Sequence, residues 1–211
     1  SVISDFLQSG FRKSILSKYY RSPRTLYATT IMIPLALSTV APASFNEDLK
    51  YSYCWAALFE GDLVHKDGIT FRFWGASDDV FAVQVDDELV LNASFRADGT
   101  NPYAPWWSSP APYSQQLLGN QYRTGSKWIT LEPGVPLDFK AIVGESPGGE
   151  FAAQLLVEVE GEDYPLNDQG AKIFPIFAME PLSWELQDSI MLTLQEGEAN
   201  VTNVTTIFRD Y

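Results

Sequence analysis

The chain of 211 residues carries a formal net charge of −13, and 45% of its residues are hydrophobic. This hydrophobic content is enough to fill a core, which excludes an intrinsically disordered chain. A pI near 4.4 means that phosphate is repelled, so no nucleic-acid partner is expected. The single cysteine, Cys54, excludes an internal disulfide and a cysteine-based zinc cluster, and the single histidine, His65, excludes histidine-rich metal sites.

The start of the sequence and its longest apolar stretch indicate neither a secretory signal nor a membrane span. Residues 1–7 lack the basic start and the long apolar run of a signal peptide. Residues 30–43 are fewer than the roughly 18 that a membrane-spanning helix needs, and they include Pro34 and Pro42. The protein is therefore expected to be intracellular, or to be a mature or trimmed chain from which the signal segment is absent.

Residues 1–22 are predicted to form an amphipathic helix. Ser4 is expected to cap this helix, and Pro23 to end it near Tyr20. Apolar residues recur every four positions, at Ile3, Leu7, Phe11 and Ile15.

The same end of the chain is basic, whereas the rest is strongly acidic. Residues 1–25 hold five basic residues and one acid, and the remainder holds nine basic and 26 acidic residues, a net charge of −17. In one interpretation the basic segment docks on the acidic body or is solvated. In the other it is an arm that binds a membrane surface or a partner.

From residue 23 onward the apolar period changes to two, which is typical of strands. About ten short strands without helical crossovers predict an all-β fold, an antiparallel β-sandwich, in a single domain over residues 23–211. Pro147, Gly148 and Gly149 are expected to join the strands on either side of them as a hairpin. The expected strands cover residues 26–33, 53–59, 70–74, 81–85, 89–92, 128–131, 137–143, 151–159, 173–177, 190–194 and 205–208.

Residues 93–125 have no clear strand pattern and contain four prolines and several aromatic residues. So long a loop in a compact domain is usually functional or disordered, and its aromatic content argues against disorder. The sequence therefore predicts a functional loop here.

Residues 68–91, which read GITFRFWGASDDVFAVQVDDELVL, resemble the signature of the anthrax protective antigen domain family. In that family a strand leads to a Ser-Asp-Asp turn, here at 77–79, followed by a second strand, a tight turn and a third strand. The tight turn usually contains Asn-Gly or Asp-Gly, whereas this chain has Asp-Asp-Glu at 86–88. Residues 134–159 are similar to the closing hairpin of the same family.

The resemblance implies a lectin-like β-sandwich, often a non-catalytic module beside glycosidases or a cell-surface adhesin. The variant with an N-terminal helix and aromatic loops is met mainly in secreted or envelope proteins of bacteria. In the lectin branch, adjacent aspartates joined by a cis peptide hold a calcium ion that bridges to sugar hydroxyls. On that basis Asp78 and Asp79 are the candidate metal ligands, and calcium is the candidate cofactor.

Elementary chemistry leaves two interpretations of Asp78 and Asp79. Neighbouring carboxylates repel unless a cation or a donor lies between them, and Ca²⁺ accepts six to eight oxygens in flexible geometry. Asn92, Asn101 and backbone carbonyls of the long loop could supply further oxygens. Alternatively, Asp79 turns inward and accepts backbone N–H bonds at the start of the strand.

The aromatic residues of the long loop form a second candidate site. Exposed Trp and Tyr rings offer flat faces to sugar rings and polar tips for hydrogen bonds. The alternative is that these rings fold back over a sheet as part of the core. The candidate ligand-binding residues are Asn101, Tyr103, Trp106, Trp107 and Tyr113.

No catalytic residues are predicted, so the protein is not expected to be an enzyme. His65 precedes a turn and is expected to be solvated rather than to act as a general base. No serine stands in a Gly-x-Ser-x-Gly setting. Acidic pairs are available at Asp86, Asp87, Glu145 and Glu150, but nothing in the sequence selects one, and Glu145 reads most simply as a hairpin residue.

The sequence thus favours a non-catalytic extracytoplasmic module that binds a glycan or polysaccharide with the help of calcium. The alternative is a structural or protein-interaction module of a bacterial envelope complex, whose aromatic loop and helix contact envelope proteins.

Overall fold

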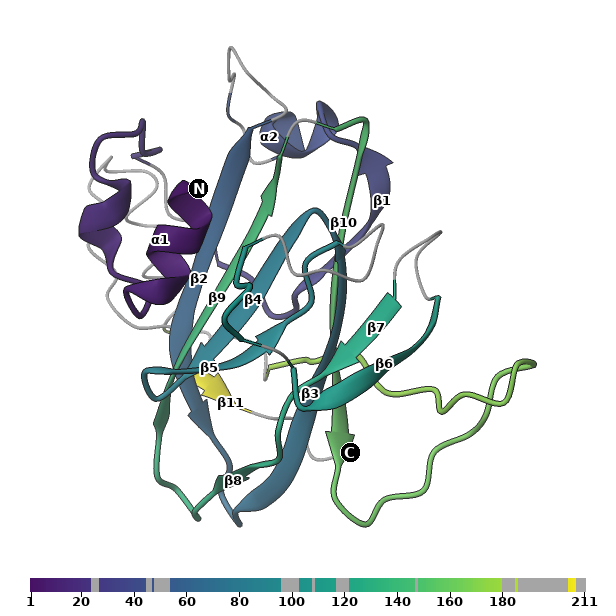
Figure 1. Ribbon diagram of the computed structural model, residues 1–211. Helices are drawn as coiled ribbons and strands as arrows, with labels where there is room; N and C mark the ends of the chain where they lie inside the picture. Colours follow the sequence, from purple (N-terminus) through teal and green to yellow (C-terminus); the bar gives the residue numbers. More distant parts are fainter. Residues whose placement is uncertain are drawn as a thin grey trace.

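The computed structural model of the protein is a sandwich of two β-sheets (Figure 1). It confirms the expected all-β architecture with a short N-terminal helix. No helix among the described residues is long and apolar enough to cross a membrane. The residues described are 1–23, 27–44, 47, 54–95, 103–107, 109–116, 122–146, 148–179, 185 and 205–207.

The first sheet has the strand order β1-β10-β3-β7-β6, with β8 also paired to β3. Its strands are β1 (Met32–Leu37), β3 (Ile69–Asp78), β6 (Ala111–Gln116), β7 (Tyr122–Gly125), β8 (Ile129–Leu131) and β10 (Glu150–Val159). The second sheet has the order β11-β2-β9-β4-β5. Its strands are β2 (Trp55–Val64), β4 (Val80–Val85), β5 (Glu88–Asn92), β9 (Leu137–Glu145) and β11 (Thr205–Ile207).

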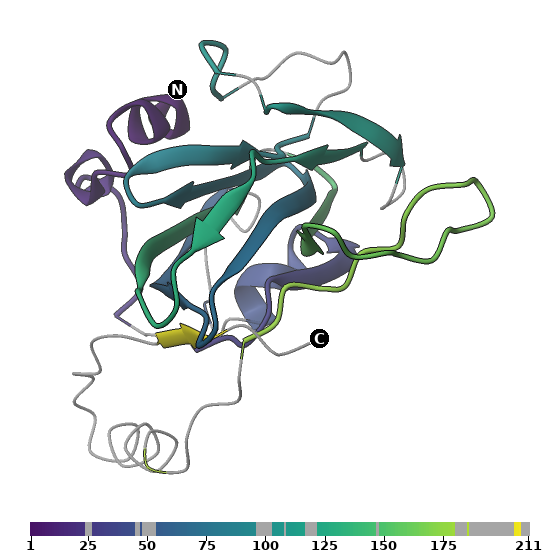
Figure 2. The ribbon, with the colours of Figure 1, turned by 90° about the horizontal axis from the view of Figure 1, so that it is seen from below.

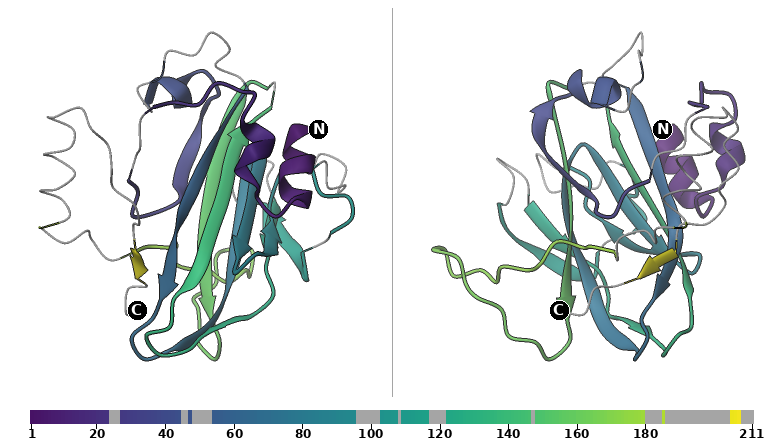
Figure 3. Two further views of the ribbon diagram at one scale, coloured as in Figure 1. Left: turned by 90° about the vertical axis from the view of Figure 1, so that its left-hand side faces the viewer. Right: turned by 180° about the vertical axis from the view of Figure 1, so that it is seen from behind.

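Strand pairs within both sheets are antiparallel except for β11, which pairs in parallel with β2 at its edge (Figure 3). A parallel pair cannot be closed by a tight turn, so it needs a long connection. The distance in sequence between β2 and β11 provides that connection.

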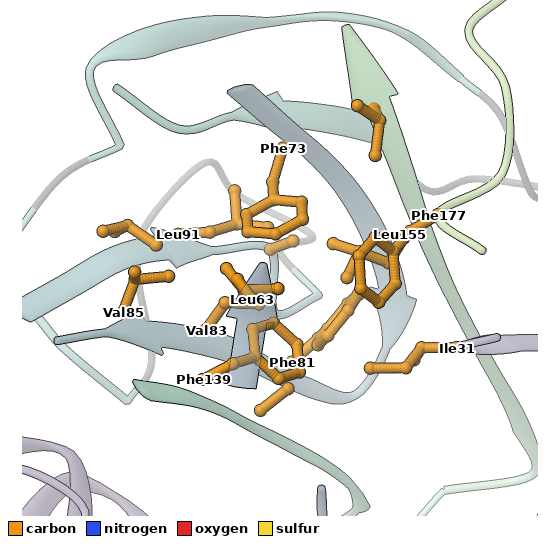
Figure 4. Close-up of a cluster of buried hydrophobic side chains, with 14 of the residues drawn as sticks. Ile31, Leu63, Phe73, Phe81, Val83, Val85, Leu91, Phe139, Leu155 and Phe177 are labelled. Atoms are coloured by element: carbon orange, nitrogen blue, oxygen red, sulfur yellow. The ribbon is translucent and has the colours of Figure 1, made fainter. Parts of the chain in front are cut away.

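The core between the sheets consists mainly of phenylalanine and aliphatic side chains from alternate strand positions. Figure 4 shows Phe73, Phe81, Phe139 and Phe177 pointing into this layer with their neighbours. The Phe73 ring lies 5.5 Å from that of Phe177 and 6.0 Å from that of Phe139. Full burial of a side chain of this size contributes about 2–3 kcal/mol, which makes this layer the main source of stability.

The basic N-terminal segment packs on the outer face of the second sheet (Figure 1). Phe6, Leu7 and Phe11 are buried against Val80 and Ile142 of that sheet. Lys13 also forms an ion pair with Glu60 at 2.6 Å. The segment therefore docks on the acidic body, in keeping with the first of the two interpretations of its charge.

The prediction of one helix reaching residue 20 is wrong in extent. The helix α1 (Val2–Gln8) is capped by Ser1, whose Oγ accepts from the backbone N–H of Ser4, and a separate 3₁₀-helix, η1 (Lys13–Leu16), follows. Between them Gly10 and Phe11 have φ angles of 72° and 58°, which end an α-helix. The turn back at these residues lets Phe11 contact Phe6 at 5.0 Å between ring centroids.

Several strand predictions need correction. Residues 93–125 contain β6 and β7, which sequence periodicity missed, and the first strand lies at 32–37 rather than 26–33. Residues 173–177 make isolated bridges, such as Leu156 to Ile176, rather than a continuous strand. The expected strand at 190–194 lies outside the described residues, and a short helix, α2 (Val40–Ser44), follows β1.

The segment 160–179 leaves the end of β10 and returns beside it (Figure 2), where Ile176 bridges to Leu156 along the edge of the strand. Tyr164 and Phe174 of the segment pack with Trp74 and Leu156. Glu158 of β10 connects this segment to the sheet. Its Oε2 accepts from Arg72 Nε at 2.6 Å and from Trp74 Nε1 at 2.7 Å, and its Oε1 accepts from Lys172 Nζ at 3.4 Å. The Arg72 guanidinium also lies over the rings of Trp74 and Trp128. The cluster attaches this segment to the sheet.

The polar turn at Asp86 and Asp87 is a two-residue hairpin, although it lacks the glycine that the family usually has. Val85 pairs with Glu88, and the two aspartates have φ angles of 50° and 64°. Left-handed backbone at both central positions is the geometry of a type I′ turn, and aspartate tolerates it better than most residues.

Candidate functional site

Two connections that cross between the sheets meet at one end of the sandwich. The first runs from β3 to β4 through Asp79, and the second from β9 to β10 through residues 146–149. They are adjacent because β3 pairs with β10, placing Asp78 opposite Ala152, and β4 pairs with β9, placing Val80 opposite Gly144.

The prediction that β9 and β10 form a hairpin is therefore wrong, because the two strands belong to different sheets. Gly148 and Gly149 also do not have the positive φ angles that such a hairpin was expected to use. Their segment instead carries the chain from one sheet to the other, beside the Asp78–Asp79 turn.

The peptide bond between Asp78 and Asp79 is cis, as the family resemblance implied. Asp79 Oδ2 accepts the backbone N–H of Ser146 at 3.0 Å, and its backbone carbonyl accepts the N–H of Phe95 at 2.6 Å. The inward-turned interpretation of Asp79 thus holds for one of its oxygens.

The environment of Asp78 disfavours its charged form. Burial is the largest cause, followed by a hydrogen bond with Asp79 and by the negative charges of Asp79 and Glu150, and together they raise the pKa of Asp78 to about 7. A cation bound beside Asp78 would therefore stabilise the charged form of its carboxyl group.

Glu145, at the end of β9, is the residue of this site that sequence reasoning missed. The residue is only 4% exposed, and neither carboxylate oxygen has a hydrogen-bond partner among the described residues. Burial, and then the charges of Asp79 and Asp78, raise the pKa of Glu145 to about 8. The sequence signal was an acid at the end of an apolar strand, which reads equally well as a turn residue.

Tyr103 brings the aromatic loop to the same place. It forms a hydrogen bond with Ser146 and lies within the field of Asp79 and Glu145. Burial raises the pKa of Tyr103, and the charges of Asp79, Glu145 and Asp78 act in the same direction, against the hydrogen bond with Ser146. The two candidate sites predicted from the sequence, the aspartate pair and the aromatic loop, are therefore joined through this tyrosine.

The other aromatic residues divide between the two interpretations of the loop. Trp107 packs with Tyr103 against the cluster under the N-terminal helix, as a core residue does. Trp106 is 46% exposed and presents its ring to solvent. Tyr113 belongs to β6 but its side chain is not described, and Asn101 lies outside the described residues.

The remaining predicted residues do not join the site. Asn92 is buried, and its Oδ1 accepts from the backbone N–H of Ser94 at 3.2 Å. His65 is nearly buried rather than solvated, and its Nδ1 accepts from the backbone N–H of Asp67. It lies beyond the end of β2 opposite to Trp55, the residue that pairs with Glu145.

The donor set at the crossings suits a hard cation such as Ca²⁺, because it consists of carboxylate oxygens, a phenol and backbone groups. Gly148 lies against these acids, since a Cβ at this residue would lie 2.7 Å from Glu145 Oε1 and 3.8 Å from Asp79 Oδ2. Within the described parts of the chain, no three His, Cys, Asp or Glu side chains are already arranged as a metal site. The residues therefore fit calcium in chemistry but not as a preformed cage.

Comparison with protein-family models and with the curated proteins gives no match. Among solved structures, the chain is similar to the PA14 domain of the antifreeze protein MpAFP, with a TM-score of 0.50 and 14% identity over 83% of this chain and 78% of that one. A PA14 sugar-binding domain from an RTX adhesin gives a TM-score of 0.34 at 15% identity, with coverage of 56% and 53%. The A domain of epithelial adhesin 6 from Candida glabrata, in complex with Galβ1-3GlcNAc, gives 0.36 at 12% identity, with coverage of 72% and 62%. The first of these likenesses shows a lectin-like sandwich with the fold of a PA14 domain.

Proposed function

We propose that the protein is a non-catalytic, extracytoplasmic carbohydrate-binding module whose ligand binds, with the help of calcium, where the two crossings meet. One observation carries the proposal: Asp78, Asp79 and the aromatic loop residue Tyr103 lie together at one end of a PA14-type sandwich. The sheets hold Asp78 and Asp79 in place, since this pair lies where β3 ends and β4 begins.

Calcium supplies charge and open coordination positions to such a site. Asp78 and Asp79 would hold the ion with their carboxylates, and backbone carbonyls of the adjacent connections could complete the shell. Neighbouring hydroxyls of a sugar are the hard oxygen ligands that the ion accepts. A bound cation would also relieve the repulsion that raises the pKa of Asp78.

The exposed aromatic ring of Trp106 supports the carbohydrate part of the proposal. Trp106 follows Tyr103 by three residues and keeps nearly half of its surface in solvent. A flat, exposed indole can cover the C–H face of a sugar ring while the aspartate pair fixes its hydroxyls. Trp107, which packs inward, supports the loop instead.

A glycan panel probed in calcium and then in chelator tests this function. The wild-type protein should retain at least one glycan class in calcium and release it in chelator, and D78N should lose retention in both. Tryptophan fluorescence and retention that do not change over the whole panel would contradict the proposal.

A structural role in an envelope complex has one observation in its favour. Leu35 and Leu37 of β1, an edge strand, and Val40 of α2 are all largely exposed, with Leu37 61% exposed. Exposed apolar side chains on an edge strand are suited to contact with another protein. Association that is lost in L37E while no glycan binds to wild type would favour this alternative.

A further inference from the structure

We propose that Glu145 is a third carboxylate ligand of the cation at Asp78 and Asp79, and that it moves into place when the ion binds. This inference rests on the calcium-assisted function proposed above. It adds Glu145 to the ligands that the aspartate pair supplies.

The first support is the state of the Glu145 carboxylate. The residue is 96% buried, and neither oxygen receives a hydrogen bond from any group in the described part of the chain. A buried carboxylate without a donor or a counter-ion is strongly unfavourable, so such groups are almost always paired, metal-bound or protonated. The one other buried acid among the described residues, Glu158, accepts from Arg72, Trp74 and Lys172.

The second support is position. Glu145 is the last residue of β9, and the next residue, Ser146, donates its backbone N–H to Asp79 Oδ2. The charges of Asp79 and Asp78 act on Glu145 more strongly than those of any other group. The carboxylate therefore faces the aspartate pair across a connection that the hydrogen bond holds in place.

The third support is the close approach of the Glu145 carboxylate to Gly148. A Cβ at this residue would lie 2.7 Å from Glu145 Oε1 and also within 3.8 Å of Asp79 Oδ2. Any side chain here would displace the Glu145 carboxylate and occupy space beside both acids. The backbone of Gly148 has no positive φ that would require glycine, so its lack of a side chain has this other explanation.

The three acids are not yet arranged as a cage, so binding requires a rearrangement of Glu145. Glutamate has three side-chain torsions and can reach a nearby ion by changing rotamers without moving β9. A third carboxylate would give the ligand set three formal negative charges, one more than Ca²⁺ neutralises. We therefore expect the site to prefer a trivalent lanthanide, which resembles Ca²⁺ in size and coordination, over Ca²⁺ itself.

Terbium and calcium titrations of three single variants test the inference. Tyr103, beside the acids, serves as the sensitiser of terbium luminescence. E145Q removes the charge with little change in shape. In G148A the one contact of the added Cβ below 3.0 Å is with Glu145 Oε1, so the variant displaces this flexible carboxylate and leaves the backbone in place. Gly149→Ala is the matched control, because nothing lies within 4 Å of its added Cβ. We expect E145Q and G148A to weaken binding of both ions by about tenfold or more, and the Gly149 variant to bind like wild type within about twofold.

Thermal unfolding with and without calcium gives a second readout. Calcium should raise the melting temperature of E145Q less than that of wild type, because the variant lacks one carboxylate ligand. Equal calcium affinity in E145Q and wild type would overturn the role of Glu145 and leave the aspartate site standing. Absence of binding in wild type would overturn both.

Discussion

The backbone N–H of Ser146 donates to Asp79 Oδ2 at 3.0 Å, and this bond joins the two chain crossings at the candidate site. One oxygen of Asp79 is thereby committed to structure. In the proposed calcium site the same side chain would serve both of the roles that sequence chemistry offered as alternatives.

Substitutions of Asp79 should separate these two roles. D79N keeps an oxygen that accepts the Ser146 N–H, so we expect a change of less than about 0.5 kcal/mol in the free energy of unfolding but loss of calcium binding. D79A loses the acceptor as well, and should destabilise by about 1–2 kcal/mol. Urea unfolding and calorimetric titration of both variants measure this, and equal destabilisation by the two would contradict it.

The two adjacent tryptophans should respond differently to truncation. W106A removes a ring that is largely in solvent, so stability should change by less than about 0.5 kcal/mol while glycan retention falls. W107A removes contacts with the cluster under α1 and should cost about 1–3 kcal/mol. Chemical unfolding and glycan retention, measured on both, would show the reverse pattern if Trp106 were the structural residue.

Gly144 should not tolerate a side chain. Its Cβ would lie 2.5 Å from the backbone carbonyl of Trp55 on β2, and backbone cannot move aside as a side chain does. We expect G144A to destabilise by about 2 kcal/mol or more. The Gly149 variant, with open space around its Cβ, is the control in the same unfolding assay. Wild-type stability in G144A would mean that the two strands separate more easily than their pairing indicates.

The β4–β5 turn should be open to improvement. Asp86 and Asp87 both hold left-handed backbone, where Asn-Gly is the favoured pair. The double variant D86N/D87G should stabilise by about 0.5 kcal/mol, since Asp87 is exposed and its 3.7 Å contact with Lys140 contributes little. A rise of a few degrees in melting temperature would support this, and a fall would contradict the turn type.

Stability at acid pH should depend on Glu158. Burial acts to raise its pKa, but hydrogen bonds from Arg72 and Trp74, together with the charge of Arg72, outweigh burial and lower it below the ordinary value of 4.5. A carboxyl whose folded pKa is lowered stabilises the fold above its unfolded pKa, and this stabilisation is lost as pH falls through the folded one.

Urea unfolding between pH 7 and pH 3 measures the contribution of Glu158. E158Q should be less stable than wild type at pH 7, and the difference should shrink as pH falls below about 4.5. The exposed neighbour variant E160Q serves as the control. A difference that stays constant over this range would show that Glu158 acts through packing rather than charge.

Much of the fold followed from local patterns. The period of two placed β3, β4, β9 and β10 within a few residues, because each of these strands alternates or runs apolar and is bounded by turn residues. β6 and β7 were missed because both are largely polar, β6 contains Pro112, and pairing with the sheet stabilises them. The helix was predicted too long because periodicity does not reveal that Gly10 and Phe11 turn the chain back.

For the candidate site, the sequence by itself determined the aspartate pair and the aromatic residues, since Asp78–Asp79 and Trp106 are recognisable by residue type and neighbours. Only the tertiary structure decided that Glu145 belongs with them. The reason is sheet topology. Because β9 and β10 lie in different sheets, the segment between them crosses the sandwich beside Asp79 instead of closing a hairpin. Charge in a sequence shows how many acids a protein has, but burial and pairing across sheets decide which of them are left without a partner.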